Sequence, residues 1–193
     1  MTANKTVAIH FCDCKDPTCP DPTLKLGDTE IRFVNEHKFL GLIWDKELTF
    51  HSHIQNLLKK CRKSLNIIKI LSYSNWGSDS KTLLKLFRTL IRSKIDYGSI
   101  VYRSAKDIND LEALNVLHRQ GIRLCLGAFK SSPKEALYVE ANEPHLRFRR
   151  DELAMRYGLK IKANSENPVY DSIFNLPYSE KYEDEDRNSL PLG

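Results

Sequence analysis

The sequence predicts an α+β protein that is predominantly helical, with a small N-terminal β-hairpin unit followed by an orthogonal helical bundle. The first 50 residues contain short alternating apolar runs separated by glycine, proline and aspartate, a pattern typical of strands and turns. From His51 onward the apolar residues recur with a helical period. The chain has 193 residues, of which 41% are hydrophobic, enough for one packed domain with a small appendage.

The β unit is expected in residues 1–48. Lys5–Cys12 alternates between apolar and polar positions, as in a strand with one buried face. The Gly27-Asp28 pair separates two short alternating runs and indicates a β-hairpin. Phe39–Trp44 is a third apolar run, expected to be a strand packed on both faces. Such a unit is too thin to hold a large core alone.

The helical bundle is expected in residues 49–130. Its first helix begins near His51, and a break over Ser72–Gly77 separates it from a second helix capped within Ser78–Ser80. A third helix is expected over Asp110–Cys125, and the glycine two residues later supplies its stop. Apolar stripes on these helices are expected to face a common core.

Two further segments complete the predicted organisation. Residues 131–165 form a helical connection region, in which Ser132, Pro133 and Glu135 start a short helix with a capping box. A final amphipathic helix covers His145–Ala163. Residues 166–193 contain two basic and seven acidic residues and are expected to form a flexible acidic tail.

Charge is distributed unevenly along the chain. The net charge is +5, but residues 51–163 carry twenty-two Lys/Arg and ten Asp/Glu, a local net charge of +12. A segment this basic predicts a polyanionic partner, and nucleic acid is the commonest large polyanion in a cell. The alternative is a helical domain with an ordinary lysine-rich surface.

Two groups of basic residues are the candidate nucleic-acid-binding sites. In the second helix, four of them follow one another at spacings of 4, 3 and 4, without an acidic i+4 partner, in a stripe about 16 Å long. A stripe of that length can contact several successive phosphates, although a solvated helix face is the alternative. The candidates are Lys59, Lys60, Arg62 and Lys63 in the first helix, and Lys81, Lys85, Arg88 and Arg92 in the second.

A candidate zinc site lies near the N-terminus, where His10, Cys12, Cys14 and Cys19 offer four soft ligands within ten residues. Their spacing departs from paired C-x2-C motifs, so thiols on a strand and its turn are the alternative. Five cysteines without a secretory signal predict reduced thiols in an intracellular protein, nuclear or cytoplasmic. No apolar run approaches the roughly 20 residues that span a bilayer, so no membrane partner is expected.

Signatures of catalysis are missing from the sequence. There is no nucleophile elbow, Walker loop, zinc-protease motif or dinucleotide fingerprint, and no two aspartates are adjacent. His37, His51, His53 and His118 are expected to be surface or hydrogen-bonded polar residues. The residues themselves therefore predict no enzymatic activity.

Several segments, in order along the chain, resemble landmarks of non-LTR retrotransposon reverse transcriptases of the jockey type (long interspersed elements). The resemblance extends over residues 4–175, almost the whole chain. The segments are Lys38–Asp45, Leu48–Phe50 with His53-Ile54, Leu83–Leu86, Ser93–Gly98, Leu124–Lys130, Ser132-Pro133 and Tyr138–Pro144.

The resemblance implies that the chain corresponds to the C-terminal part of such an enzyme: the end of the palm, the thumb and the connection region. Lys5 matches the palm lysine, and Phe39, Leu40 and Gly41 match the primer-grip segment. The family's catalytic Asp-Asp turn, which binds Mg²⁺, precedes the matched region. The fragment is therefore expected to be no polymerase on its own and to need no cofactor.

The expected residual role is nonspecific binding of an RNA/DNA template–primer duplex through the basic thumb helices. The alternative is a stand-alone protein-interaction module without a nucleic-acid role, which self-associates through the exposed palm hairpin.

Overall fold

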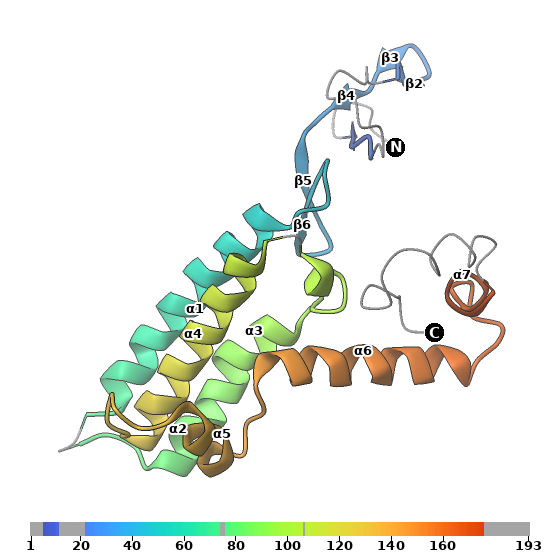
Figure 1. Cartoon of the computed structure of the whole chain (residues 1–193). Coiled ribbons are helices and arrows are strands. Elements are labelled where there is room, and N and C mark those ends of the chain that lie inside the picture. The colour runs from blue at the N-terminus through green and yellow to red at the C-terminus, as the bar shows by residue number, and fades with distance from the viewer. Residues whose placement is uncertain (1–5, 12–21, 74–75, 106, 176–193) are drawn as a thin grey trace. The chain divides into compact units, whose positions relative to one another are not determined.

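The computed structural model describes residues 6–11, 22–73, 76–105 and 107–175 (Figure 1). These residues form a predominantly helical α+β chain, as the sequence predicts. The chain divides into two compact units, residues 1–143 and residues 144–193, which are described separately. Predictions for Lys5, Cys12, Cys14 and Cys19, and for residues 176–193 of the expected tail, lie outside the described residues.

The β part of the first unit consists of short strand pairs. The described strands are β1 (Val7–Ala8), parallel to β4 (Arg32–Phe33); β2 (Lys25–Leu26), antiparallel to β3 (Thr29–Glu30); and β5 (Glu36–Phe39), antiparallel to β6 (Leu42–Asp45). Gly27 lies in the turn between β2 and β3 with φ of 63°, a conformation that glycine adopts without strain. The hairpin predicted at Gly27-Asp28 is therefore confirmed.

The prediction of one strand over Phe39–Trp44 was wrong. The chain reverses inside this run, because Leu40 and Gly41 form the turn between β5 and β6, with φ angles of 46° and 85°. Every residue of β5 is exposed, and only Leu42 of β6 is buried. The segment is therefore a hairpin whose first strand and turn are exposed, and the glycine within the apolar run was the local sign of its turn.

The helices of the first unit lie close to their predicted positions. The main helices are α1 (His51–Leu71), α2 (Ser80–Phe87), α4 (Ile108–Leu126) and α5 (Lys134–Ala141); between α2 and α4 lie η2 (Arg88–Arg92), α3 (Ser93–Asp96) and η3 (Tyr102–Ser104). Helices α1 and α4 run side by side and share the most extensive helix–helix contact of this unit (Figure 1). The orthogonal arrangement that the sequence predicts is not evident in this pair.

The helix boundaries follow from identifiable caps. The Asp79 carboxylate accepts hydrogen bonds from Lys81 N and Thr82 N at the start of α2, and Gly127 ends α4 with φ of 63°. Both features agree with the sequence analysis. The predicted capping box at Ser132 does not form, because Pro133 is extended (ψ 141°) and occupies the N-cap position without a side-chain hydrogen bond.

The two residues that precede α1 are held by a side chain from the preceding hairpin. Asp45, the last residue of β6, accepts hydrogen bonds from Thr49 N at 2.8 Å and Phe50 N at 2.7 Å. Burial alone would raise the pKa of Asp45, but these backbone hydrogen bonds outweigh it and hold the pKa below its ordinary value of 3.8. The start of α1 is thereby joined to β6.

The core of the first unit lies between α1, α2 and α4. Ile54, Leu58 and Ile68 of α1 are almost fully buried, which confirms the apolar stripe predicted for this helix. Helices α2 and α4 approach closely at Gly121, where an added Cβ would lie 2.3 Å from Cε2 of Phe87. Only glycine fits at that position without a shift of the aromatic ring.

The second unit contains α6 (Leu146–Lys162) and α7 (Tyr170–Phe174). His145 caps α6, because its Nδ1 accepts a hydrogen bond from Arg147 N at 3.1 Å. Helix α7 lies in the segment that the sequence analysis assigned to the acidic tail. Among the helices of the described residues, none is both long enough and apolar enough to cross a membrane.

Candidate nucleic-acid interface

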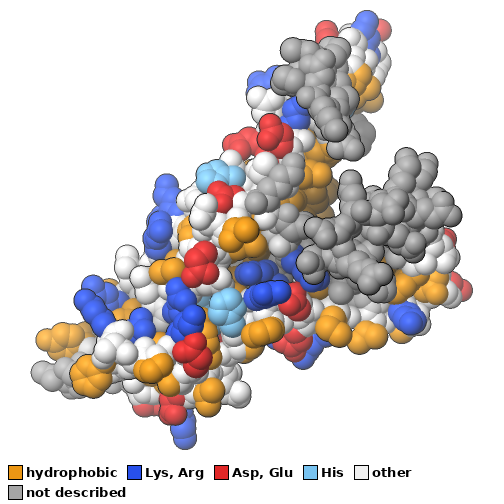
Figure 2. All heavy atoms as spheres, viewed as in Figure 1, with side chains coloured by type: hydrophobic (Ala, Val, Ile, Leu, Met, Phe, Trp, Pro, Cys, Tyr) orange, Lys and Arg blue, Asp and Glu red, His pale blue; other side chains and the backbone are white. Residues whose placement is uncertain are grey.

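The predicted basic cluster of α1 lies on the solvent side of the helix. Its four side chains are all exposed, because the apolar stripe on the opposite side packs against the core. Basic side chains recur along the edge of the molecule that α1 occupies (Figure 2). The members of this cluster are Lys59, Lys60, Arg62 and Lys63.

The second predicted group does not form one ladder of basic side chains. Lys81 and Lys85 of α2 are exposed, but Arg88 and Arg92 are bound by the buried carboxylate of Glu143. These four residues were also expected to have no acidic i+4 partner, whereas Arg92 Nε lies 3.7 Å from a carboxylate oxygen of Asp96. The expectation of a stripe of four basic positions without an acidic i+4 partner was therefore wrong, and nucleic-acid binding by these residues stays a prediction.

The Glu143 side chain is 0% exposed and accepts three hydrogen bonds from the arginines. Arg88 Nε donates to Oε1 at 2.5 Å, and Arg92 Nη1 donates to both oxygens at 2.8 Å. Arg88 Nη2 also donates to the carbonyl of Ala141 at 2.9 Å, so the network joins η2 to the end of α5. These arginines neutralise a buried charge, which they must do for the carboxylate to be tolerated.

The helical geometry explains part of this division. Residues Arg88–Arg92 form a π-helical turn between α2 and α3. A π turn contains more residues than an α turn, so the side chains within it leave the i, i+4 register of α2. Arg88 and Arg92 thus turn toward the end of α5 while Lys81 and Lys85 stay in solvent.

A pocket forms where the β5–β6 turn meets the helices. Tyr97, which follows α3, donates its hydroxyl to the carbonyl of Leu40 at 2.7 Å, and its ring lies 3.1 Å from the position of a Cβ on Gly41. The turn is thereby fastened to the helical part. The resulting pocket has a volume of about 290 Å³ and is lined by Gly41, His53, Asn56, Leu57, Lys60, Ser93, Lys94 and Tyr97.

The pocket lining combines positive charge with neutral polar groups. Lys60 comes from α1 and Lys94 from α3, and the Lys94 ammonium donates a hydrogen bond to Ser64 Oγ at 2.6 Å. Asn56 and Ser93 add an amide and a hydroxyl, and none of the described lining residues carries a carboxylate. Two ammonium groups with additional donors suit an oxyanion such as a phosphate group.

His53 contributes to this pocket as a neutral hydrogen-bond acceptor. Its Nδ1 accepts a hydrogen bond from Ile43 N of β6 at 3.3 Å. Burial lowers the pKa of His53 below its ordinary value of 6.5, and the nearby charge of Lys60 lowers it further. Because only the neutral imidazole can accept this bond, the pKa shift preserves the link between β6 and α1.

The other residues of the predicted primer-grip segment are exposed. Leu40 and Phe39 are 73% and 61% accessible. Phe39 also lines a second, apolar pocket of about 340 Å³ in the β unit, together with Val7, Ile9, Phe11, His37 and Trp44. The hairpin therefore presents apolar surface on one side and the polar pocket at its turn.

Sequence reasoning missed the pocket because its residues are separated along the chain. Lys94 and Tyr97 lie in the segment Ser93–Gly98, which was informative only for the family resemblance, and Glu143 lies about fifty residues from its arginine partners. Of the candidate zinc ligands only His10 is described, so zinc binding there stays a prediction.

The chain is similar to a Retrovirus-related Pol polyprotein from type-1 retrotransposable element R1 4 of Nasonia vitripennis. The two sequences are 24% identical over 141 residues, which cover 73% of this chain and 36% of the relative. The chain thus spans about a third of the length of that protein. Neither a family model nor a solved structure matches the chain. The similarity supports an origin in a retrotransposable element.

Proposed function

We propose that this chain corresponds to the C-terminal part of a non-LTR, jockey-type reverse transcriptase, comprising the end of the palm, the thumb and the connection region. Its residual function is to bind an RNA/DNA template–primer duplex, without catalysing polymerisation itself. The similarity to a retrotransposon Pol polyprotein supports the origin. The observation that carries the function is the pocket that Gly41 lines together with Lys60 and Lys94.

In this proposal the pocket and the basic surface of α1 act on the same strand. One backbone phosphate occupies the pocket, between the two ammonium groups, while neighbouring phosphates meet Lys59, Arg62 and Lys63. Lys81 and Lys85 extend the contact to α2. Such contacts hold a duplex in place without reading its sequence, so binding is nonspecific and weakens as salt concentration rises.

The β5–β6 turn takes the role of a primer grip in this proposal. Its backbone is held by the hydrogen bond from Tyr97 to Leu40, so the turn presents a fixed edge beside the pocket. In the parent enzyme, the catalytic aspartates and their Mg²⁺ ions belong to a preceding region. The residues of this chain position the nucleic acid, and catalysis requires those preceding groups.

Fluorescence anisotropy of a labelled RNA–DNA hybrid tests the proposal, with a salt series and a Lys60→Ala/Lys94→Ala variant. A matched Lys160→Ala/Lys162→Ala variant removes the same charge from exposed positions of α6. We expect salt-sensitive binding, a loss of affinity of tenfold or more in the pocket variant, and a smaller loss in the control. Salt-insensitive binding, equal losses in both variants, or no binding by the folded protein would refute the proposal.

A second candidate function is self-association through the β unit. Phe11 and Phe39 line its apolar pocket and are 48% and 61% exposed, which is unusual for large aromatic side chains. Size-exclusion chromatography with light scattering tests this function. A discrete dimer that Phe39→Ser converts to monomer would support it, and a wild-type monomer at high concentration would exclude it.

A further inference from the structure

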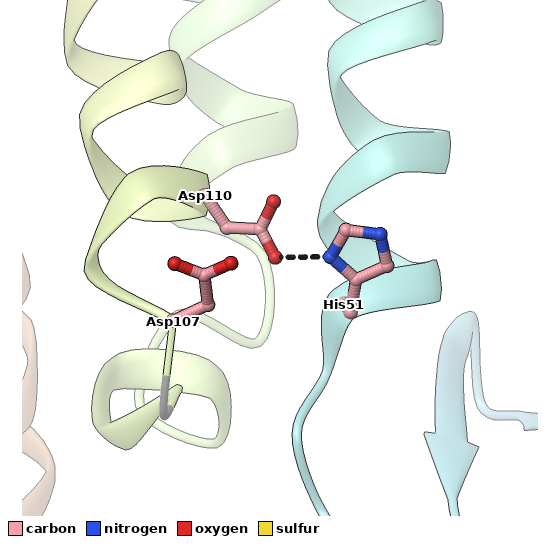
Figure 3. A group of neighbouring side chains, drawn as sticks. All are labelled: His51, Asp107 and Asp110. Carbon is pink, nitrogen blue, oxygen red and sulfur yellow. Dashed lines mark hydrogen bonds and ion pairs between the residues drawn. The ribbon is translucent and has the colours of Figure 1, made fainter.

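A mixed cluster of metal-ligating side chains lies where the first turns of α1 and α4 meet (Figure 3). His51 begins α1, Asp107 caps α4, and Asp110 lies in the first turn of α4. One ligand atom from each residue lies within 4.8 Å of the others. Figure 3 shows the two carboxylates side by side, with the His51 imidazole facing Asp110.

The carboxylate of Asp110 is held in place by two different partners. Its residue is 4% exposed, and its Oδ1 accepts a hydrogen bond from Gln55 Nε2 at 2.8 Å. Its Oδ2 lies 2.7 Å from His51 Nδ1. Carboxylate ligands of metal sites are often held in the same way, by a hydrogen bond from a residue that does not itself bind the metal, as Gln55 holds Asp110 here.

Asp107 brings a second negative charge to the cluster. One of its oxygens accepts a hydrogen bond from Asn109 N at 2.8 Å, which caps α4. A protonated His51 would neutralise only one of the two carboxylates. A divalent cation would neutralise both, and its attraction to the two carboxylates would outweigh its repulsion from the positive ends of the two helix dipoles.

We propose that His51, Asp107 and Asp110 bind a divalent metal ion of the Zn²⁺ type, with water in the remaining coordination position. Zn²⁺ accepts one imidazole nitrogen and carboxylate oxygens at about 2.0–2.2 Å, and three protein ligands with one open position are an established arrangement. Tetrahedral ligands at those bond lengths lie about 3.4 Å apart. Side-chain movements of about 1 Å would bring the present atoms to that spacing.

Binding of the ion would replace the hydrogen bond between His51 Nδ1 and Asp110 Oδ2. A metal-bound Nδ1 carries no proton, so any proton between the two groups is released to solvent, and Nδ1 and Oδ2 of Asp110 each give a lone pair to the metal. The ion would then join the starts of α1 and α4, whose residues are more than fifty positions apart. This site is separate from the proposed nucleic-acid interface and does not depend on it.

Zn²⁺ titration by calorimetry and the visible absorption of the Co²⁺ form test the proposal. A Cys12→Ser/Cys14→Ser/Cys19→Ser background removes competing thiolates, and the Co²⁺ spectrum should then show nitrogen and oxygen ligands without thiolate charge transfer. Asp107→Asn is the informative variant, because asparagine is as good an N-cap as aspartate but lacks the charge. Asp79→Asn makes the same change at the cap of α2 and is the control.

We expect one ion per chain in the background protein and in Asp79→Asn, and at least tenfold weaker binding in Asp107→Asn. The melting temperature should rise with Zn²⁺ in the first two proteins and not in the third, because an ion that binds only the native state stabilises it. Equal affinities of the two variants would mean adventitious binding and overturn the proposal. Absence of stoichiometric binding by the folded background protein would overturn it as well.

Discussion

Replacement of Glu143 by glutamine should destabilise the first unit strongly. The Glu143 side chain is 0% exposed and accepts three hydrogen bonds from Arg88 and Arg92. Glutamine has nearly the same volume, so it leaves no cavity, but it removes the charge and turns one acceptor into a donor that faces a guanidinium. The change therefore isolates the electrostatic part of this network.

The magnitude follows from the burial of the partners. Loss of one partner from a fully buried ion pair costs about 3–5 kcal/mol in the free energy of unfolding. Arg88 and Arg92 are 34% and 24% exposed, so water can replace part of the lost interaction. We therefore expect Glu143→Gln to lower the free energy of unfolding by about 2–3 kcal/mol. This is less than the loss for a fully buried pair and close to the value of a single hydrogen bond to a charged group.

Urea denaturation followed by circular dichroism measures this loss as a lower midpoint with an unchanged slope. The control is Glu152→Gln, which removes surface pairs with Arg149 and Arg156 on α6 and should cost less than about 1 kcal/mol. If Glu143→Gln were no less stable than Glu152→Gln, the network would be dispensable. The assignment of Arg88 and Arg92 to a structural role would then be wrong.

Three further predictions concern the helices of the first unit. Gly121→Ala should lower stability by about 1–3 kcal/mol in thermal denaturation, because its Cβ would overlap the Phe87 ring; an unchanged melting temperature would contradict the close packing of α2 and α4. Asp45→Asn should cost about 1–2 kcal/mol at neutral pH. Because folding lowers the pKa of Asp45, its contribution to stability is complete above the ordinary value of 3.8 and is lost as pH falls through the lower folded pKa. The free energies of unfolding of the wild type and Asp45→Asn, measured against pH, should therefore converge in acid. Burial raises the pKa of the Cys61 and Cys125 thiols to about 11 and about 12, so in a Cys12→Ser/Cys14→Ser/Cys19→Ser background both should react with a thiol reagent only after unfolding, and rapid labelling of that native protein would contradict their burial.

The helices could be predicted from the sequence because each signal is local. The apolar period of α1, the Asp79 cap and the Gly127 stop all act within a few residues of the boundary that they set. The hairpin at Leu40-Gly41 was missed for the opposite reason. An apolar run predicts a buried strand by composition, whereas its turn depends on one glycine and on a hydrogen bond from Tyr97, 57 residues away.

In the candidate interface, too, the features set by local sequence were predictable and those set by distant residues were not. The exposure of Lys59, Lys60, Arg62 and Lys63 follows from the amphipathic pattern of one helix. The sequence pattern does not show that Lys81 is exposed while Arg88 is bound by Glu143, because this difference depends on a π turn and on a distant residue. Equally, nothing near Lys94 in the sequence indicates that it shares a pocket with Lys60.

Three tethers couple the β5–β6 hairpin to the helices beside this pocket. Tyr97 holds the turn at Leu40, His53 accepts from Ile43 N, and Asp45 accepts from Phe50 N, directly before α1. The His53 tether requires a neutral imidazole, so its contribution is complete above the usual histidine pKa of about 6.5 and declines as pH falls from there toward the lower folded pKa. Acidification would then loosen the turn from the pocket. A ligand gripped by both the turn and the lysines should therefore bind less tightly in mild acid, whereas simple attraction to a basic surface would not weaken.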